Sequence, residues 1–380
     1  MNAKLSATAN SSANLIVIIQ ASSAIVDGSL QGDTWIESSD GFITSVNSGI
    51  HSNPDTTTDG VLIPGFVDIH CHGGGGHYFS ASSPESISAA INAHKKTGTS
   101  SIVASLVSES IDDLKAQIQR LVPFFIRGEI IGIHLEGPYL SHARCGAHEP
   151  SLLIDPTVAQ IKELIALGQG SIKMVTIAPE LNGAQETIKY LVSVGVIAAI
   201  GHTEAHFQDA SAATDNGASV VTHFLNAMNK ESTQGSIANF VMNDSRLAVE
   251  LIVDGHHLSF QKVQEISASI GDRIIMVSDA MAAAGNGDGK YTIGALPVEV
   301  KDGVARLVSN QKLAGSTLTI SQAFTNLLNH CGLSLEQAVH ATSTQPAKAF
   351  GLKDRGSIAV GMRADLLSYN SSTKSVTVIS

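Results

Sequence analysis

The stretch Phe66-Val67-Asp68-Ile69-His70-Cys71-His72 joins a short apolar run to a His-x-His pair. Successive side chains of a strand point to opposite faces, so His70 and His72 share one side while Cys71 faces the other. The stretch is therefore typical of a buried strand that ends at a metal site, with Cys71 as a packed thiol and not a ligand. In a chain with 15 histidines this pair alone is a weak signal, so the other strand ends decide its meaning.

Strand-like and helix-like stretches alternate through the middle of the chain. Eight apolar runs have strand length, at 66–69, 101–105, 130–135, 172–177, 196–200, 219–222, 248–253 and 274–278. Amphipathic stretches of helical length fill the gaps, at 84–97, 111–127, 157–167, 184–194, 207–216 and 259–270. Such alternation predicts β-α units around a parallel sheet, and eight units predict a closed (β/α)8 barrel of the TIM type.

Metal-ligand side chains follow five of the eight runs. They are His70 and His72 after the first, Glu136 after the third, His202 after the fifth, His223 after the sixth and Asp279 after the eighth. A single histidine at a strand end is more often a hydrogen-bonded structural residue, and a single carboxylate there is more often a helix cap. All six fall at the same end of their strands, however, and in a barrel these ends share the face where active sites lie. The pattern therefore predicts one metal site.

The ligand types indicate the chemistry of that site. Imidazoles and carboxylates without thiolates suit Zn²⁺, Fe²⁺, Co²⁺ or Mn²⁺ with one position open to water. Such an ion polarises a carbonyl group and lowers the pKa of water, while a nearby carboxylate moves the proton. We take Asp279 as the candidate for that carboxylate. The residues predict metal-assisted hydrolysis of an amide or a related bond.

Composition excludes several other classes. The 380 residues are 43% hydrophobic and carry a net charge of -11, which argues against nucleic acid or an anionic membrane as a partner. No apolar run reaches membrane-spanning length, and the polar residues 1–14 are expected to form a frayed tail. Three widely spaced cysteines, Cys71, Cys145 and Cys331, do not make a disulfide framework. A reducing compartment, the cytoplasm, is the expected location.

The two ends of the chain are similar in style. Short β-type runs at 15–19, 34–37 and 42–46, with a turn at Asp40-Gly41, are matched by runs at 364–368 and 375–379. We expect them to form one small composite β-sandwich domain, made of residues 1–58 and 352–380, beside a catalytic barrel at 59–351. A further hairpin is expected at 291–308, with its reversal at Asp302-Gly303.

Several segments together resemble the metal-dependent amidohydrolases, and within them the N-acetylglucosamine-6-phosphate deacetylase family. The resemblance runs nearly end to end. It is carried by Pro64 to His70, His134-Leu135-Glu136-Gly137-Pro138-Tyr139, Gly201-His202-Thr203, Thr222 to Met228, Asp254-Gly255-His256-His257, Ser278-Asp279-Ala280 and Leu313-Ala314-Gly315-Ser316. The His-Leu-Glu-Gly-Pro and Asn-Ala-Met segments are the specific ones, because His-x-His is shared by the whole superfamily.

The resemblance implies roles for individual residues. Glu136, His202 and His223 would hold the principal metal, and Asp279 would be the general base that activates water and then protonates the departing amine. Substrate contacts are implied for Ala147, His148, Asn226, Ala227, His257, Leu313, Ala314 and Gly315. From the residues alone, Asn226 would be read as a turn-stabilising amide and His257 as a polar loop residue with His256 as its rival.

Two further features concern the metal and the substrate. Some members lack the His pair of the first strand and keep one metal, whereas this chain has His70 and His72, so one or two ions are expected, bridged by Glu136. Well-known members bind the sugar phosphate with an Arg from the neighbouring subunit of a homodimer, and residues 229–235 of this chain contain no Arg. Lys230, Arg144 or Arg246 would have to compensate, although a lysine offers only a point charge in place of the planar fork.

The expected activity is hydrolysis of the N-acetyl group of an amino-sugar phosphate, with Zn²⁺ as the first choice of metal. The alternatives are a deacetylase of N-acetylgalactosamine-6-phosphate or of an unphosphorylated sugar, a cyclic-amide hydrolase, a deaminase of the superfamily, and an inactive metal-binding scaffold. An intact Asp279 argues against the scaffold, which has no need of a general base.

Overall fold

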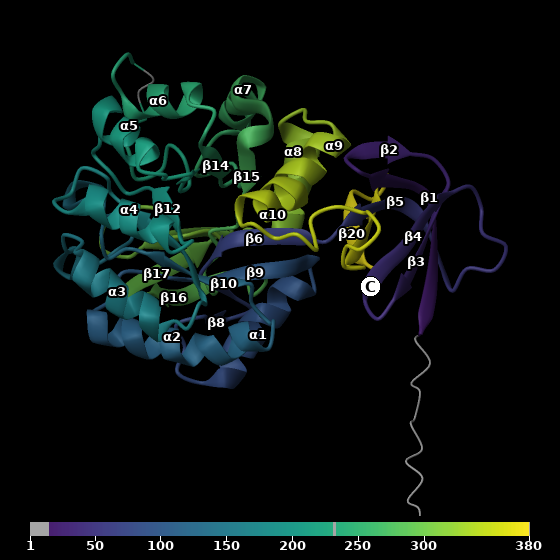
Figure 1. Ribbon diagram of the computed structural model, residues 1–380, viewed down its shortest axis with the longest axis horizontal. Helices are drawn as coiled ribbons and strands as arrows, with labels where there is room; N and C mark the ends of the chain where they lie inside the picture. Colours follow the sequence, from purple (N-terminus) through teal and green to yellow (C-terminus); the bar gives the residue numbers. More distant parts are fainter. Residues whose placement is uncertain (1–14, 231–232, 380) are drawn as a thin grey trace, which may run out of the picture.

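The computed structural model describes residues 15–230 and 233–379. It consists of a barrel surrounded by helices and a smaller sheet beside it (Figure 1). The tail predicted at residues 1–14 lies outside the described residues. No helix within the described ranges combines the length and the apolar character needed to cross a membrane.

Eight parallel strands form the barrel, and each pairs with its neighbours in chain order. They are β6 (Phe66–Cys71), β9 (Thr99–Leu106), β10 (Gly132–Glu136), β11 (Ile172–Ile177), β12 (Ile197–Ile200), β13 (Val220–Val221), β14 (Ala248–Leu251) and β15 (Ile274–Met276). The two ends of the sheet meet just after β15, where Cys71 and Ala280 form a parallel bridge and the Asp279 backbone N–H donates to the His70 carbonyl oxygen over 2.9 Å. The predicted (β/α)8 barrel is confirmed.

Helices cover the outside of the barrel (Figure 1). They are α1 (Pro84–Lys95), α2 (Ile111–Ile126), α3 (Val158–Leu167), α4 (Ala184–Ser193), α5 (Phe207–Asp215), α6 (Ile237–Asn243), α7 (Phe260–Ile270) and α8 (Ile320–His330), followed by α9 (Leu335–Val339), a π-helical turn at His340–Thr344 and α10 (Gln345–Ala349). Short 3-10 turns occur at His142–Arg144, Pro150–Leu152 and Gly271–Arg273. The six helices expected from sequence are present, with ends shifted by at most two residues.

Local sequence explains the helix starts and the strand burial. Ser110 caps α2 by accepting a hydrogen bond from the Asp113 backbone, and Thr319 with Gln322 forms a capping box at α8, a helix that the sequence reading did not identify. Every residue of β10 is buried, because the barrel interior covers one face of the strand and the helices cover the other.

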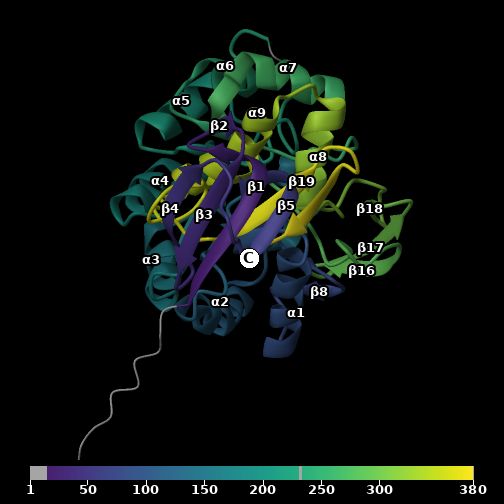
Figure 2. The same ribbon diagram turned by 90° about the vertical axis from the view of Figure 1, so that its right-hand side faces the viewer.

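The N-terminal and C-terminal segments share one mixed sheet, which Figure 2 shows from the side that faces away from the barrel. Its order is β20-β19-β5-β1-β3-β4, with β2 added to β1. The strands are β1 (Ile16–Val26), β2 (Ser29–Gln31), β3 (Thr34–Ser39), β4 (Phe42–Ser48), β5 (Thr56–Pro64), β19 (Leu366–Asn370) and β20 (Ser375–Val378). The expectation that the two ends meet in one small domain is confirmed. The described residues of that domain form a single seven-stranded sheet and not the two packed sheets of the predicted sandwich, and the boundaries at 58/59 and 351/352 stay a prediction.

A three-stranded antiparallel sheet follows β15 along the chain. It consists of β16 (Gly289–Ile293), β17 (Leu296–Lys301) and β18 (Val304–Leu307), and the residues of its second turn have φ of 53° at Asp302 and 75° at Gly303. These left-handed values suit the Asp-Gly turn predicted there. A two-stranded ribbon of β7 (Gly73–Gly74) and β8 (His77–Tyr78) lies directly after the His-x-His pair.

Candidate metal centre and substrate cavity

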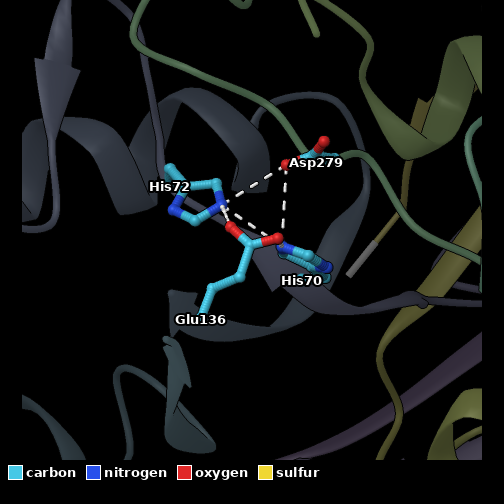
Figure 3. A group of neighbouring side chains, drawn as sticks. All are labelled: His70, His72, Glu136 and Asp279. Carbon is cyan, nitrogen blue, oxygen red and sulfur yellow. Dashed lines mark hydrogen bonds and ion pairs between the residues drawn. The ribbon is translucent and has the colours of Figure 1, made fainter. Parts of the chain in front are cut away.

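The six side chains predicted as ligands converge at the carboxyl ends of the barrel strands, and none of them is more than 7% exposed. Figure 3 shows four of them, with His70, His72 and Asp279 directed at the carboxylate of Glu136. His202 and His223 approach the same carboxylate from β12 and β13. Segments far apart in the sequence therefore form a single cluster.

Glu136 lies at the centre of this cluster. Its Oε1 is 2.9 Å from His223 Nε2 and 3.1 Å from His202 Nε2, while its Oε2 is 3.1 Å from His72 Nε2. On the far side of His72, Asp279 Oδ1 is 3.3 Å from the same Nε2 and 3.6 Å from His70 Nε2. Oε1 of Glu136 thus faces His202, His223 and, at 3.5 Å, His70, while Oε2 faces His72.

The donor atoms fit a bound cation. His202 Nδ1 donates to the Arg144 carbonyl oxygen over 2.9 Å, which leaves the Nε2 lone pair directed inward, only 2.9 Å from His223 Nε2. His70 Nδ1 likewise donates to Glu250 and leaves its Nε2 3.2 Å from that of His72. A metal bound at about 2.1 Å brings its ligands to within about 4 Å of one another, and a second buried partner on Nδ1 is typical of metal-binding histidines.

Electrostatics holds both carboxylates in the ionised form. Burial opposes the charge of Glu136, but the electrostatic effect of His70 and the short contacts of the His148, His202 and His223 ring nitrogens outweigh it and hold the pKa of that carboxyl well below 4.5. For Asp279 burial also raises the pKa, and the hydrogen bond from His72 lowers it below 3.8 on balance. Both groups can therefore act as anionic ligands, and Asp279 as a base.

His148 belongs to the site in a different way. Its Nδ1 accepts a hydrogen bond from the Ser108 backbone N–H over 3.2 Å, so the proton of the neutral ring is on Nε2, which points at Glu136 Oε2 from 3.4 Å. Burial lowers the pKa of this imidazole to about 4. His148 is therefore a neutral N–H donor facing the cavity, and although its Nε2 lies close to Glu136 and His202, the proton on that atom argues against a role as a metal ligand.

A cavity of about 410 Å³ opens above the cluster. Its walls include Glu136, His202, His223 and Asp279, together with the predicted substrate residues Ala147, His148, Asn226, Ala227, His257, Leu313 and Gly315. His257 Nδ1 donates to Asp254 over 2.7 Å, which leaves its Nε2 available, whereas His256 is exposed outside the cavity. Ala314 is buried in the core of the three-stranded sheet and does not line the cavity.

Strained backbone is concentrated around this cavity. His202, His223, Leu225, Ala227 and Asp279 all have positive φ, between 27° and 66°. Such values are unfavourable for residues other than glycine and persist where the surrounding structure enforces them, often at functional sites. The close fit extends to Gly201, where an added Cβ would lie 2.7 Å from that of Thr222. The strand ends are thus shaped to aim His202 and His223 inward.

The sequence reading missed two residues of the site. Glu250 is fully buried in β14, and its Oε2 accepts hydrogen bonds from His70 Nδ1 over 3.0 Å and from the His223 backbone over 3.1 Å. Lys312 lines the cavity next to the predicted Leu313. A carboxylate inside the buried run Ala248-Val249-Glu250-Leu251 was a signal for the first, because an unpaired charge is too costly there.

The fold, the buried carboxylate-histidine cluster and the cavity above it define a metal-dependent hydrolase of the barrel type. Residues 61–379 match the model of the amidohydrolase family. The match spans most of the chain, so this protein belongs to the amidohydrolase family.

Individual relatives are more specific. The chain is 33% identical over 88% of its length to an N-acetylglucosamine-6-phosphate deacetylase from Lysinibacillus sphaericus, of which the match covers 88%. It is 32% identical over 82% of its length to an N-acetylgalactosamine-6-phosphate deacetylase from Escherichia coli O157:H7, of which 84% is covered. A solved structure of N-acetyl-D-glucosamine-6-phosphate deacetylase from Mycobacterium smegmatis, a variant in complex with N-acetyl-D-glucosamine-6-phosphate, superposes with a TM-score of 0.92 at 39% identity, covering 96% of this chain and 97% of the other.

Proposed function

We propose that this protein hydrolyses the N-acetyl group of N-acetylglucosamine-6-phosphate to give glucosamine-6-phosphate and acetate, a step of amino-sugar catabolism. The observation that carries the proposal is the ionised Asp279 carboxylate, which lies 3.3 Å from His72 in the cation-binding cluster and also lines the cavity. The similarity to deacetylases of this sugar phosphate over nearly the whole chain supports the same substrate.

The residues divide the work as follows. Glu136, His202 and His223 would hold the principal cation, and His70 and His72 would offer a second position next to Glu136. A bound divalent cation would polarise the amide carbonyl and lower the pKa of the attacking water. Asp279 takes the proton from that water and returns it to the amine nitrogen as the C–N bond breaks. The Nε2–H of His148 points into the cavity, where it can donate to the developing oxyanion.

Zn²⁺ is the metal that we propose, with Fe²⁺, Co²⁺ or Mn²⁺ as alternatives and one or two ions per subunit, because the donor set is limited to imidazole and carboxylate. We further propose that the protein acts as a cytoplasmic homodimer on a small-molecule amino sugar. Metal content per subunit and mass by light scattering test the stoichiometry and the dimer.

Acetate release from N-acetylglucosamine-6-phosphate tests the activity. Asp279→Asn should lower kcat by about 10²–10⁴-fold, the contribution of a positioned acid-base group, while bound metal stays at the wild-type level. Asp272→Asn, at an exposed carboxylate between α7 and β15, is the matched control and should leave kcat unchanged. A protein that releases ammonia from a purine or pyrimidine, and no acetate from the sugar phosphate, would be a deaminase. A metal-loaded protein that turns over neither kind of substrate would be a scaffold.

The galactosamine epimer is the second candidate, because a relative of that activity is 32% identical to this chain. The two sugars differ only in the orientation of the C4 hydroxyl group. Comparing kcat/KM for the two 6-phosphates decides between them, and a preference for the galactosamine epimer would reassign the substrate within the same chemistry.

A further inference from the structure

The substrate cavity carries two lysines on separate loops. Lys230 follows the Asn226-Ala227 pair, and Lys312 precedes Leu313 after β18. Both are exposed, and neither ammonium group forms an ion pair or hydrogen bond with another of the described residues. In a chain with 34 acidic and 23 basic residues, two uncommitted ammonium groups on one cavity form a local concentration of positive charge.

The other two cations considered for the phosphate are already engaged. Arg144 also lines the cavity, but its guanidinium pairs with Glu204. Arg246 lies on the outer surface, where Asp244 and Asp215 accept its hydrogen bonds at 2.5 and 2.8 Å. Arg246 does not line the cavity of its own chain, and its guanidinium is committed to these two carboxylates.

The phosphate of the substrate lies at the opposite end of the ring from the amide. In a pyranose ring C2, which bears the N-acetyl group, lies opposite C5, which bears the C6 phosphate. When the amide lies at Glu136 and Asp279, the phosphate must lie across the ring, away from those two carboxylates and against other walls of the cavity. The backbone of Lys312 is fixed on one of these walls, because its backbone N–H donates to Asn310 Oδ1 over 3.0 Å and its carbonyl oxygen accepts from the Leu307 backbone N–H over 2.8 Å.

We infer that Lys312 and Lys230 of the same chain bind the 6-phosphate of the substrate. The inference rests on the proposed function and deepens it by assigning the phosphate site. A phosphate monoester carries a charge of about -1.5 to -2 at pH 7, so two ammonium groups neutralise it. Ammonium groups act as point charges without the geometry of a guanidinium fork, so this site recognises charge more than orientation.

The experiment compares kcat/KM for N-acetylglucosamine-6-phosphate with kcat/KM for N-acetylglucosamine in Lys312→Ala and Lys230→Ala. We expect the ratio to fall about tenfold in each variant, mainly through KM for the phosphorylated sugar, since a hydrogen bond to a charged group at a partly solvated site contributes this order of affinity. Lys312→Arg, which keeps the charge, should retain the ratio. The matched control is Lys290→Ala, an exposed lysine of the same three-stranded sheet outside the cavity.

Inorganic phosphate provides a second readout. It should inhibit the wild type competitively, and its inhibition constant should rise in both alanine variants and with added salt. An unchanged ratio and an unchanged phosphate inhibition constant in correctly folded Lys312→Ala and Lys230→Ala would overturn the assignment while leaving the deacetylase intact. A wild type that releases no acetate from either sugar would instead refute the proposed function.

Discussion

Glu250 offers the sharpest test of how the metal centre is held. This carboxylate is fully buried, and its Oε2 accepts both the His70 Nδ1–H and the His223 backbone N–H. Glu250→Ala leaves two buried N–H groups without an acceptor, each at a cost of about 1–3 kcal/mol, while removing the cost of burying the charge. We therefore expect the free energy of unfolding to fall by about 2–4 kcal/mol and the metal affinity to fall by about 10–100-fold.

Two companion variants separate charge from hydrogen bonding. Glu250→Gln can keep an oxygen at the same place, but its amide group then occupies the position of Oε1, for which the described residues offer no partner. The free energy of unfolding and the metal affinity of Glu250→Gln should therefore lie between those of the wild type and those of Glu250→Ala. Glu265→Ala, at an exposed carboxylate of α7 that pairs with Lys262, is the control and should change neither quantity measurably.

Urea unfolding gives the stability, and competition with a chelator of known affinity gives the metal affinity. A Glu250→Ala protein with wild-type metal affinity would refute the view that this carboxylate orients His70 and His223. A loss confined to stability would show that it supports the strand and not the ligands.

Three other outcomes follow from the structure. Removing the metal with a chelator should abolish acetate release, and adding back one to two equivalents of Zn²⁺ should restore it; full activity in metal-free protein would contradict the role of the cluster. Phe324→Ala should lower the free energy of unfolding by about 3–5 kcal/mol in denaturant titrations, because this buried ring has its centroid 5.3 Å from that of Phe66 and 5.2 Å from that of Tyr369. The exposed control Ile126→Ala should lower it by less than about 0.5 kcal/mol. Burial lowers the pKa of His148 from 6.5 to about 4, so the unfolded chain takes up this proton at a higher pH than the folded chain does, and the free energy of unfolding should decline as pH falls from about 6.5 to 4. His148→Gln should flatten that decline. An equal slope of the free energy of unfolding against pH in both proteins would refute a neutral, buried His148.

The barrel could be predicted from the sequence because each of its strands and helices has a local sequence pattern. Each strand is a short apolar run followed by an amphipathic stretch, and the six helices predicted lie within two residues of their observed ends. The convergence of His70, Glu136 and Asp279 needed only the rule that parallel strands end on one face. The helix α8 was missed although Thr319 and Gln322 form a readable capping box.

Other features depend on contacts that local patterns do not encode. The parallel pairing of β1 with β5, and of both chain ends in one sheet, joins segments that only the folded barrel brings together. The tautomer of His148 follows from Ser108, forty residues away. Lys312 gave no signal beyond an isolated charge in a polar loop, and its place on the cavity wall depends on the three-stranded sheet that carries it.

The shared sheet also bears on how the chain matures during synthesis. Strands β1 to β5 leave the ribosome early, yet the edge of β5 that pairs with β19 stays uncovered until nearly the whole remaining chain has been translated. Until then this open edge is a template for pairing with another nascent chain. We therefore expect a product that ends immediately before Leu366 to aggregate, even though it would contain all the residues that form the barrel.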